Sequence, residues 1–170
     1  MAIKNYTTKQ SAQQSIAKIQ ESLISHGAVG IQTMFDGDKR ISSLAFALQF
    51  KDKKLYFQLP CNWRKFKQVL INQNIDIFKE KEKPKKWDKF SNSDQNYWIK
   101  KDDERKSKQD DFAYNVAWAN LKDWVLAQMA LYETEIVTMP QIFLPFMSNG
   151  KGKTLYEQLS TNNFLLGDGK

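Results

Sequence analysis

Residues 112–134 have the sequence FAYNVAWANLKDWVLAQMALYET, and this stretch decides the fold. It contains no Gly or Pro, and its Ala, Leu, Met, Gln and Lys residues favour a helix at almost every step. Wound at about 100° per residue, the apolar side chains fall on two opposite sides and leave only a narrow polar strip. A helix that is apolar on nearly all sides is covered by other elements or by a partner. The sequence therefore predicts one long central helix here.

Three polar residues of this helix, Asn120, Asp123 and Gln128, lie outside the polar strip. A buried carboxylate is costly unless a cation or an amide satisfies it, so we expect Asp123 to have such a partner. We interpret the three residues as a polar network that specifies the core, with no catalytic role.

The chain outside this helix supplies shorter elements. Residues 11–26 place apolar side chains on one helical face, and residues 63–73 follow Asn62, a favourable N-cap. Residues 28–35, 41–50 and 55–59 are three strand-like runs separated by turn residues. These patterns predict an α+β fold: a three-stranded antiparallel meander covered by helices, with the long helix towards the C-terminus.

Length, cysteine content and hydropathy limit the class of protein. A chain of 170 residues suits a single domain over residues 1–170 that buries its own core. Cys61 is the only cysteine, so disulfides are not the framework. Neither a signal peptide in MAIKNYTTKQ nor a membrane-spanning stretch is evident, so we expect a cytoplasmic protein without a membrane partner.

The middle of the chain differs from its flanks. Residues 62–108 hold 14 basic and 8 acidic side chains, and the difference of 14 − 8 = 6 positive charges accounts for most of the net charge of +7. Within this section, residues 75–108 lose the hydrophobic period but keep five aromatic residues, more than a disordered linker would hold. We therefore predict a basic, aromatic-containing and partly ordered insertion at residues 75–108.

Several segments of the chain form a recognisable series: the start MAIKNYTT, Ala117-Trp118, Lys122-Asp123-Trp124, Ala127-Gln128, Phe143-Leu144-Pro145-Phe146-Met147 and Gly152-Lys153-Thr154-Leu155-Tyr156-Glu157. Together they resemble a family of small uncharacterised proteins from phages and mobile elements. The likeness covers roughly the first seventy and last sixty residues, and residues 75–108 look longer and more basic than the family pattern. The resemblance implies a phage accessory protein acting in the cytoplasm of a bacterial host, and it supplies no catalytic residue.

Enzymatic chemistry has little support in the residues. His26 is the only histidine, and with a single cysteine it cannot build an ordinary zinc site. We therefore expect no catalytic residue, no metal and no cofactor. A metal-dependent nuclease remains an alternative, although its candidate carboxylates, such as Asp36 and Asp52, occur in turns. A structural protein that oligomerises through the long helix is the other alternative.

Binding of nucleic acid is the preferred hypothesis. Lysines neutralise phosphates and flat rings stack on bases, and their combination is typical of proteins that bind RNA or single-stranded DNA. We expect the partner to be such a nucleic acid or a host ribonucleoprotein, and an inhibitor of an RNA-guided defence nuclease, of the anti-CRISPR kind, fits. The predicted contact residues are Arg64, Lys65, Lys67, Lys81, Lys83, Lys85, Lys86, Trp87, Lys89, Phe90, Tyr97, Trp98, Lys100 and Lys101.

Overall fold

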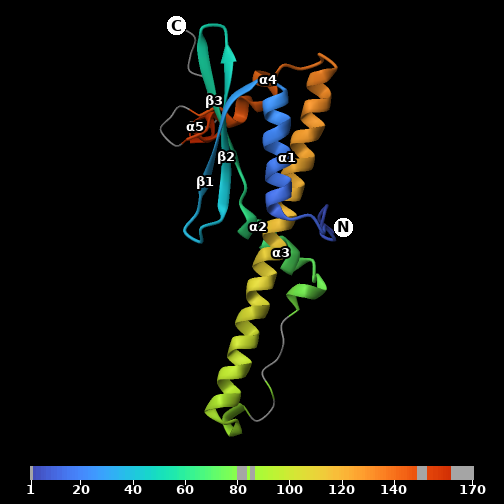
Figure 1. Cartoon of the computed structure of the whole chain (residues 1–170), viewed down its shortest axis with the longest axis vertical. Helices are drawn as coiled ribbons and strands as arrows, with labels where there is room; N and C mark the ends of the chain where they lie inside the picture. Colours follow the sequence, from blue (N-terminus) through green and yellow to red (C-terminus); the bar gives the residue numbers. More distant parts are fainter. Residues whose placement is uncertain (1, 80–83, 85–86, 149–152, 162–170) are drawn as a thin grey trace. The chain divides into compact units, whose positions relative to one another are not determined.

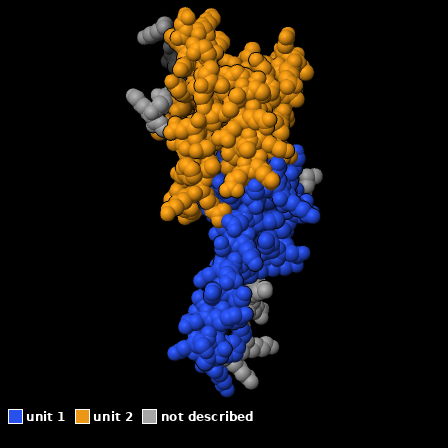
Figure 2. Space-filling view, in the orientation of Figure 1, with its two compact units in different colours: residues 1–12, 62–120 blue, residues 13–61, 121–170 orange. Residues whose placement is uncertain are grey.

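The computed structural model describes residues 2–79, 84, 87–148 and 153–161. The chain, for which the sequence predicts one domain, divides into two compact units (Figure 2). Unit 1 comprises Met1–Ala12 and Asn62–Asn120, and unit 2 comprises Gln13–Cys61 and Leu121–Lys170. The long helix α3, Asn92–Glu133, contributes residues to both units.

Unit 2 contains the predicted meander. Strands β1 (Ala28–Phe35), β2 (Ile41–Phe50) and β3 (Lys53–Pro60) pair antiparallel in the order β1-β2-β3. Helix α1 (Ala12–Ser25) lies beside the sheet and beside the C-terminal part of α3 (Figure 1). The α+β class predicted from the sequence is confirmed.

The core of unit 2 lies on one face of the sheet. Side chains alternate along a strand, so Leu44 and Phe46 of β2 share a face with Leu59 and Phe57 of β3, their cross-strand partners. All four are buried, as are Ile16, Ile19 and Leu23 of α1. Two further short elements, α4 (Met139–Phe143) and 3-10 helix η3 (Leu144–Phe146), follow α3. Phe143 joins this core with its ring centroid 4.9 Å from that of Phe46.

The edge of the sheet at β3 is extended by a later part of the chain. Met147 forms an isolated bridge with Phe57, and the Ser148 N–H donates to the Tyr56 carbonyl at 2.7 Å. Helix α5 (Leu155–Thr161) follows, and the Thr154 hydroxyl caps its first turn by accepting from the Glu157 N–H. The strand β3 edge is therefore partly covered by its own chain.

Unit 1 is helical. Helix α2 (Trp63–Asn72) is followed by the 3-10 helices η1 (Asp76–Phe78) and η2 (Trp87–Lys89) and by the first part of α3. Asn62 caps α2 as predicted, because its side chain accepts from the Lys65 N–H. The N-terminal segment is tied to this unit by the Ile3 N–H, which donates to Gln73 Oε1 at 2.8 Å.

The predicted start of the long helix was wrong, because α3 begins at Asn92 and not at Phe112. Its first part has no apolar period, so the hydrophobic pattern could not reveal it. Local interactions stabilise it instead. Ser91 and Asp94 form a cap in which the Ser91 hydroxyl accepts from the Asp94 N–H at 3.2 Å and donates to the Asp94 carboxylate at 2.6 Å. Residues 92–108, predicted as part of an irregular insertion, are therefore helical.

The covering of α3 is also less complete than predicted. Val116, Trp118 and Val125 are buried, but Leu126 and Leu131 are 39% and 43% exposed. No helix in the described ranges has the length and apolar character needed to cross a membrane.

Candidate nucleic-acid interface

The structure separates the predicted contact residues into two groups within unit 1. One group lies on α2, which packs beside the middle of α3: Lys67 Nζ lies 2.6 Å from Asp110 Oδ1, and the Trp63 and Tyr114 rings meet edge to face. The other group, which we call the tip, comprises residues 87–108. At about 1.5 Å per residue, Asp110 lies about 18 Å along the helix axis from Trp98. The two groups therefore do not form one continuous cluster.

Three of the predicted stacking rings contact one another at the tip. The Trp87 ring centroid lies 5.3 Å from that of Trp98 and 6.0 Å from that of Phe90. Gln95 fixes the arrangement, because its side-chain amide donates to the carbonyls of Trp87 and Phe90 at 3.3 and 3.2 Å. These rings are half-buried and hold η2 against α3. Their principal role is to build the tip.

Tyr97 is the exposed ring of the tip. Its side chain is 65% exposed, and Lys101 Nζ lies 5.8 Å from its ring centroid. Lys100 is its exposed neighbour along the helix. Tyr97 and Lys101 are spaced four residues apart, so they lie on the same helical face one turn apart. The structure thus places one flat ring beside two lysines in solvent.

Acidic neighbours satisfy some of the predicted cations. Lys67 pairs with Asp110, and Lys101 with Glu104 at 3.2 Å. The guanidinium of Arg64 lies 4.6 Å from the Trp63 ring centroid. Within the described ranges, Lys65, Lys89 and Lys100 form no ion pair. Four predicted lysines lie outside the described residues: Lys81, Lys83, Lys85 and Lys86.

A surface hollow of about 440 Å³ adjoins this face of α3. Its lining comprises Trp98, Lys101, Asp102 and Glu104, together with Arg105 and Lys108, which are not among the predicted contact residues. Arg105 and Lys108 follow Lys101 at helical spacing, so they extend the same face. With a helix predicted from Asn92 onward, helical spacing would have placed Arg105 and Lys108 on the same face as Lys101. Asp102 and Glu104 offset two of the three cations of the lining, Arg105 and Lys101, so an excess of one positive charge remains around the hollow.

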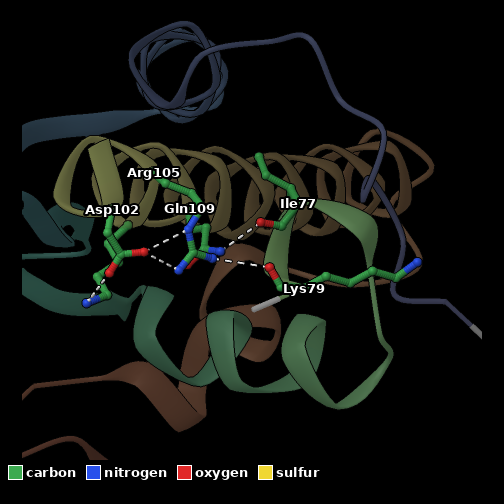
Figure 3. A network of polar contacts seen from close by, with 6 residues as sticks. Ile77, Lys79, Asp102, Arg105 and Gln109 are labelled. Atoms are coloured by element: carbon green, nitrogen blue, oxygen red, sulfur yellow. Dashed lines mark hydrogen bonds and ion pairs between the residues drawn. The ribbon is translucent and has the colours of Figure 1, made fainter. Parts of the chain in front are cut away.

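Arg105 also ties the tip to the segment that precedes it (Figure 3). Its Nη2 lies 2.6 Å from Asp102 Oδ1, and its Nη1 donates to the Lys79 carbonyl at 3.2 Å. One helical turn further on, the Gln109 amide donates to the Ile77 carbonyl at 2.7 Å. Lys106 Nζ lies 2.7 Å from the other oxygen of Asp102. Hydrogen bonds from Lys106 and Arg105 lower the pKa of Asp102, so this carboxylate stays charged and offsets two cations.

The polar residues of the long helix have local partners. Asn120 donates to the carbonyls of Lys4 and Val116 at 2.7 and 2.8 Å. Asp123 lies 3.1 Å from Lys122 Nζ, so the expected cationic partner is confirmed. Gln128 is half-buried. All three are only partly buried, which makes them less central than a core network would be.

The residues that could serve catalysis are engaged in other ways. His26 Nδ1 lies 2.6 Å from the Ser22 carbonyl oxygen, and its Nε2 lies 3.1 Å from Glu133 Oε1. Burial raises the pKa of the Cys61 thiol to about 12, so little thiolate exists at neutral pH. Among the described residues, no three His, Cys, Asp or Glu side chains converge as metal ligands would.

Comparisons with family models, curated proteins and solved structures gave no match to this chain.

Proposed function

We propose that this chain is a non-enzymatic binding protein that contacts RNA or single-stranded DNA through the tip of unit 1. The observation that supports this best is the solvent-exposed group of Tyr97, Lys100 and Lys101 beside a hollow whose lining adds Lys108 and the Asp102-paired Arg105. A flat ring next to cations offers a base and its phosphate complementary contacts at one place.

The geometry favours a single strand over a duplex. Tyr97 is a single protruding ring, and an unpaired base has a free face on which such a ring can stack. The paired bases of a duplex offer no such face to a helix-borne ring. The cations supply attraction that is independent of sequence and that weakens as salt is added.

The biological context follows from the resemblance to phage accessory proteins. This chain has exposed cations and an exposed aromatic ring, and its residues suggest no catalytic group. A small protein with these features fits a role in blocking a host nucleoprotein. An RNA-guided defence nuclease is the partner of this class that exposes single-stranded nucleic acid while it works. We therefore propose an inhibitor of the anti-CRISPR kind as the specific form of the function.

The test compares two triple variants with the same change in charge and aromatic content. The tip variant carries Tyr97→Ala, Lys100→Gln and Lys101→Gln. The control variant carries Tyr56→Ala, Lys53→Gln and Lys54→Gln on β3, where the three residues are likewise exposed. Binding of labelled single-stranded RNA and DNA is measured by fluorescence anisotropy at several salt concentrations.

We expect the tip variant to bind about tenfold or more weakly, since one stacked base contributes about 1–3 kcal/mol. Loss of two phosphate contacts should reduce the salt slope by about 1.4. The control variant should bind like wild type. No binding of any strand by wild type, or equal losses in both variants, would contradict the proposal. Mg²⁺-dependent cleavage of the labelled strand would favour the nuclease alternative.

A further inference from the structure

The two edges of the sheet in unit 2 differ in how far the rest of the chain covers them. At β3, Met147 bridges Phe57 and the Ser148 N–H donates to the Tyr56 carbonyl, so this edge is partly closed by the same chain. At β1, no strand of the described ranges lies on the outer side. Alternate N–H and C=O groups of β1 therefore face outward, and none of the described strands pairs with them.

The composition of β1 allows this edge to pair with another β-strand. Its sequence AVGIQTMF holds no charged residue and no proline, which are the usual devices that stop an edge strand from pairing. Val29, Met34 and Phe35 are exposed large apolar side chains along it. An edge with free hydrogen-bonding groups and exposed apolar side chains is suited to another β-strand, not to a helix or a small molecule.

Two irregularities limit the length over which such pairing can run. The register between β1 and β2 shifts between Ala28 and Gly30, and again between Met34 and Phe35. Bulges of this kind bend a strand and end its regular pairing. The regular segment is therefore Gly30–Met34, which has Gln32 at its centre.

We propose that this segment pairs antiparallel with the same segment of a second copy of the chain, with the two-fold axis at Gln32. In this register Gly30 of one copy faces Met34 of the other, and Gln32 faces Gln32. A Cβ added at Gly30 would meet nothing within 4 Å, so there is space for the methionine side chain that faces it. Opposed glutamine amides can bond to each other across the axis.

A second copy fits this edge better than a foreign strand because the segment complements itself. An isologous contact requires each surface to match its own image, and like charges would oppose it. The chain has a net charge of +7, yet none of that charge lies in β1. Two copies can therefore meet here without direct repulsion, and the dimer would carry two tips.

The test is the mass of the protein in solution, measured by sedimentation equilibrium as a function of concentration. Gln32 is exposed, so Gln32→Lys leaves the monomer fold intact while it places two like charges at the axis. Gln49→Lys is the matched control, because Gln49 is also exposed and lies on the same face of the sheet one strand further in. Circular dichroism verifies that each variant is folded.

We expect wild type and Gln49→Lys to dimerise and Gln32→Lys to remain monomeric. An equimolar mixture of Gln32→Lys and Gln32→Glu should form mixed dimers, because opposite charges then meet at the axis. A wild type that stays monomeric at every concentration would overturn the proposal. A Gln32→Lys dimer as tight as that of wild type would also overturn it. That result would indicate that the exposed leucines of α3 form the dimer contact.

Discussion

The two halves of α3 form one continuous helix but are stabilised in different ways. Residues 113–125 hold six fully or almost fully buried side chains, among them Ala113, Val116, Trp118 and Val125. Residues 92–108 hold no buried side chain and depend on the Ser91 cap, on ion pairs one turn apart, and on contacts of Trp98 with Trp87 and of Arg105 with Lys79. The comparison shows that burial stabilises the second half, whereas the first half is stabilised by surface contacts and keeps a solvated face.

The largest effect should come from the buried half. Trp118 has no exposed surface, so Trp118→Ala should lower the free energy of unfolding by about 3–5 kcal/mol, as expected for a large side chain lost from a core. Tyr97→Ala in the solvated half should change it by at most about 0.5 kcal/mol. Urea unfolding followed by circular dichroism measures both. Equal effects would mean that the two halves do not differ in burial as described.

A smaller effect should appear when the cap of the solvated half is removed. Ser91→Ala deletes the hydroxyl that accepts from the Asp94 N–H, which should weaken the first turn by about 1 kcal/mol. Because this turn is held locally, hydrogen exchange should accelerate near residues 92–98 and leave residues 113–125 unchanged. Ser107→Ala, an exposed position inside the same half, is the control. Faster exchange throughout α3 would contradict the separation of the two halves.

The smallest effect should be a change with pH at Asp102. Hydrogen bonds from Lys106 and Arg105 lower its pKa in the folded state, so the stabilisation is present above the unfolded value of about 4. It is lost as the pH falls through the lower, folded pKa. Hydrogen exchange at residues 98–109 should therefore show an acid-dependent loss of protection.

The Asp102→Asn variant tests the same carboxylate. It should show weaker protection at neutral pH and no such acid-dependent loss. It should also bind single strands more tightly than wild type, because the cations of Arg105 and Lys106 are no longer offset. An unchanged acid dependence in Asp102→Asn would assign the effect to other carboxylates.

The sequence was most informative where a local pattern determines the structure. The turn at residues 36–38 and the alternation of residues 41–50 predicted the meander, and Asn62 predicted the start of α2. Turn residues and caps act over a few positions, so their effect is visible without knowledge of the fold.

The remaining features were missed for two reasons: a helix without an apolar period, and contacts between distant residues. The first half of α3 lacks an apolar period, and only the Ser91–Asp94 cap marks its start. The predicted contact residues come from one section of the sequence, in which charge and rings are close together. The Lys67–Asp110 pair and the Trp87–Trp98 contact distribute those residues along a helix, and such pairings cannot be deduced from composition.

The contacts of Arg105 and Trp98 with the preceding segment bear on where the polypeptide can be divided. Lys79 is held by Arg105, and Trp87 is held by Trp98 and Gln95, so both ends of the stretch between Lys79 and Trp87 are anchored to α3. In a polypeptide divided within that stretch, Lys79 and Trp87 would keep these contacts with α3. We therefore expect two fragments divided there, each with its own reporter, to reassemble on mixing.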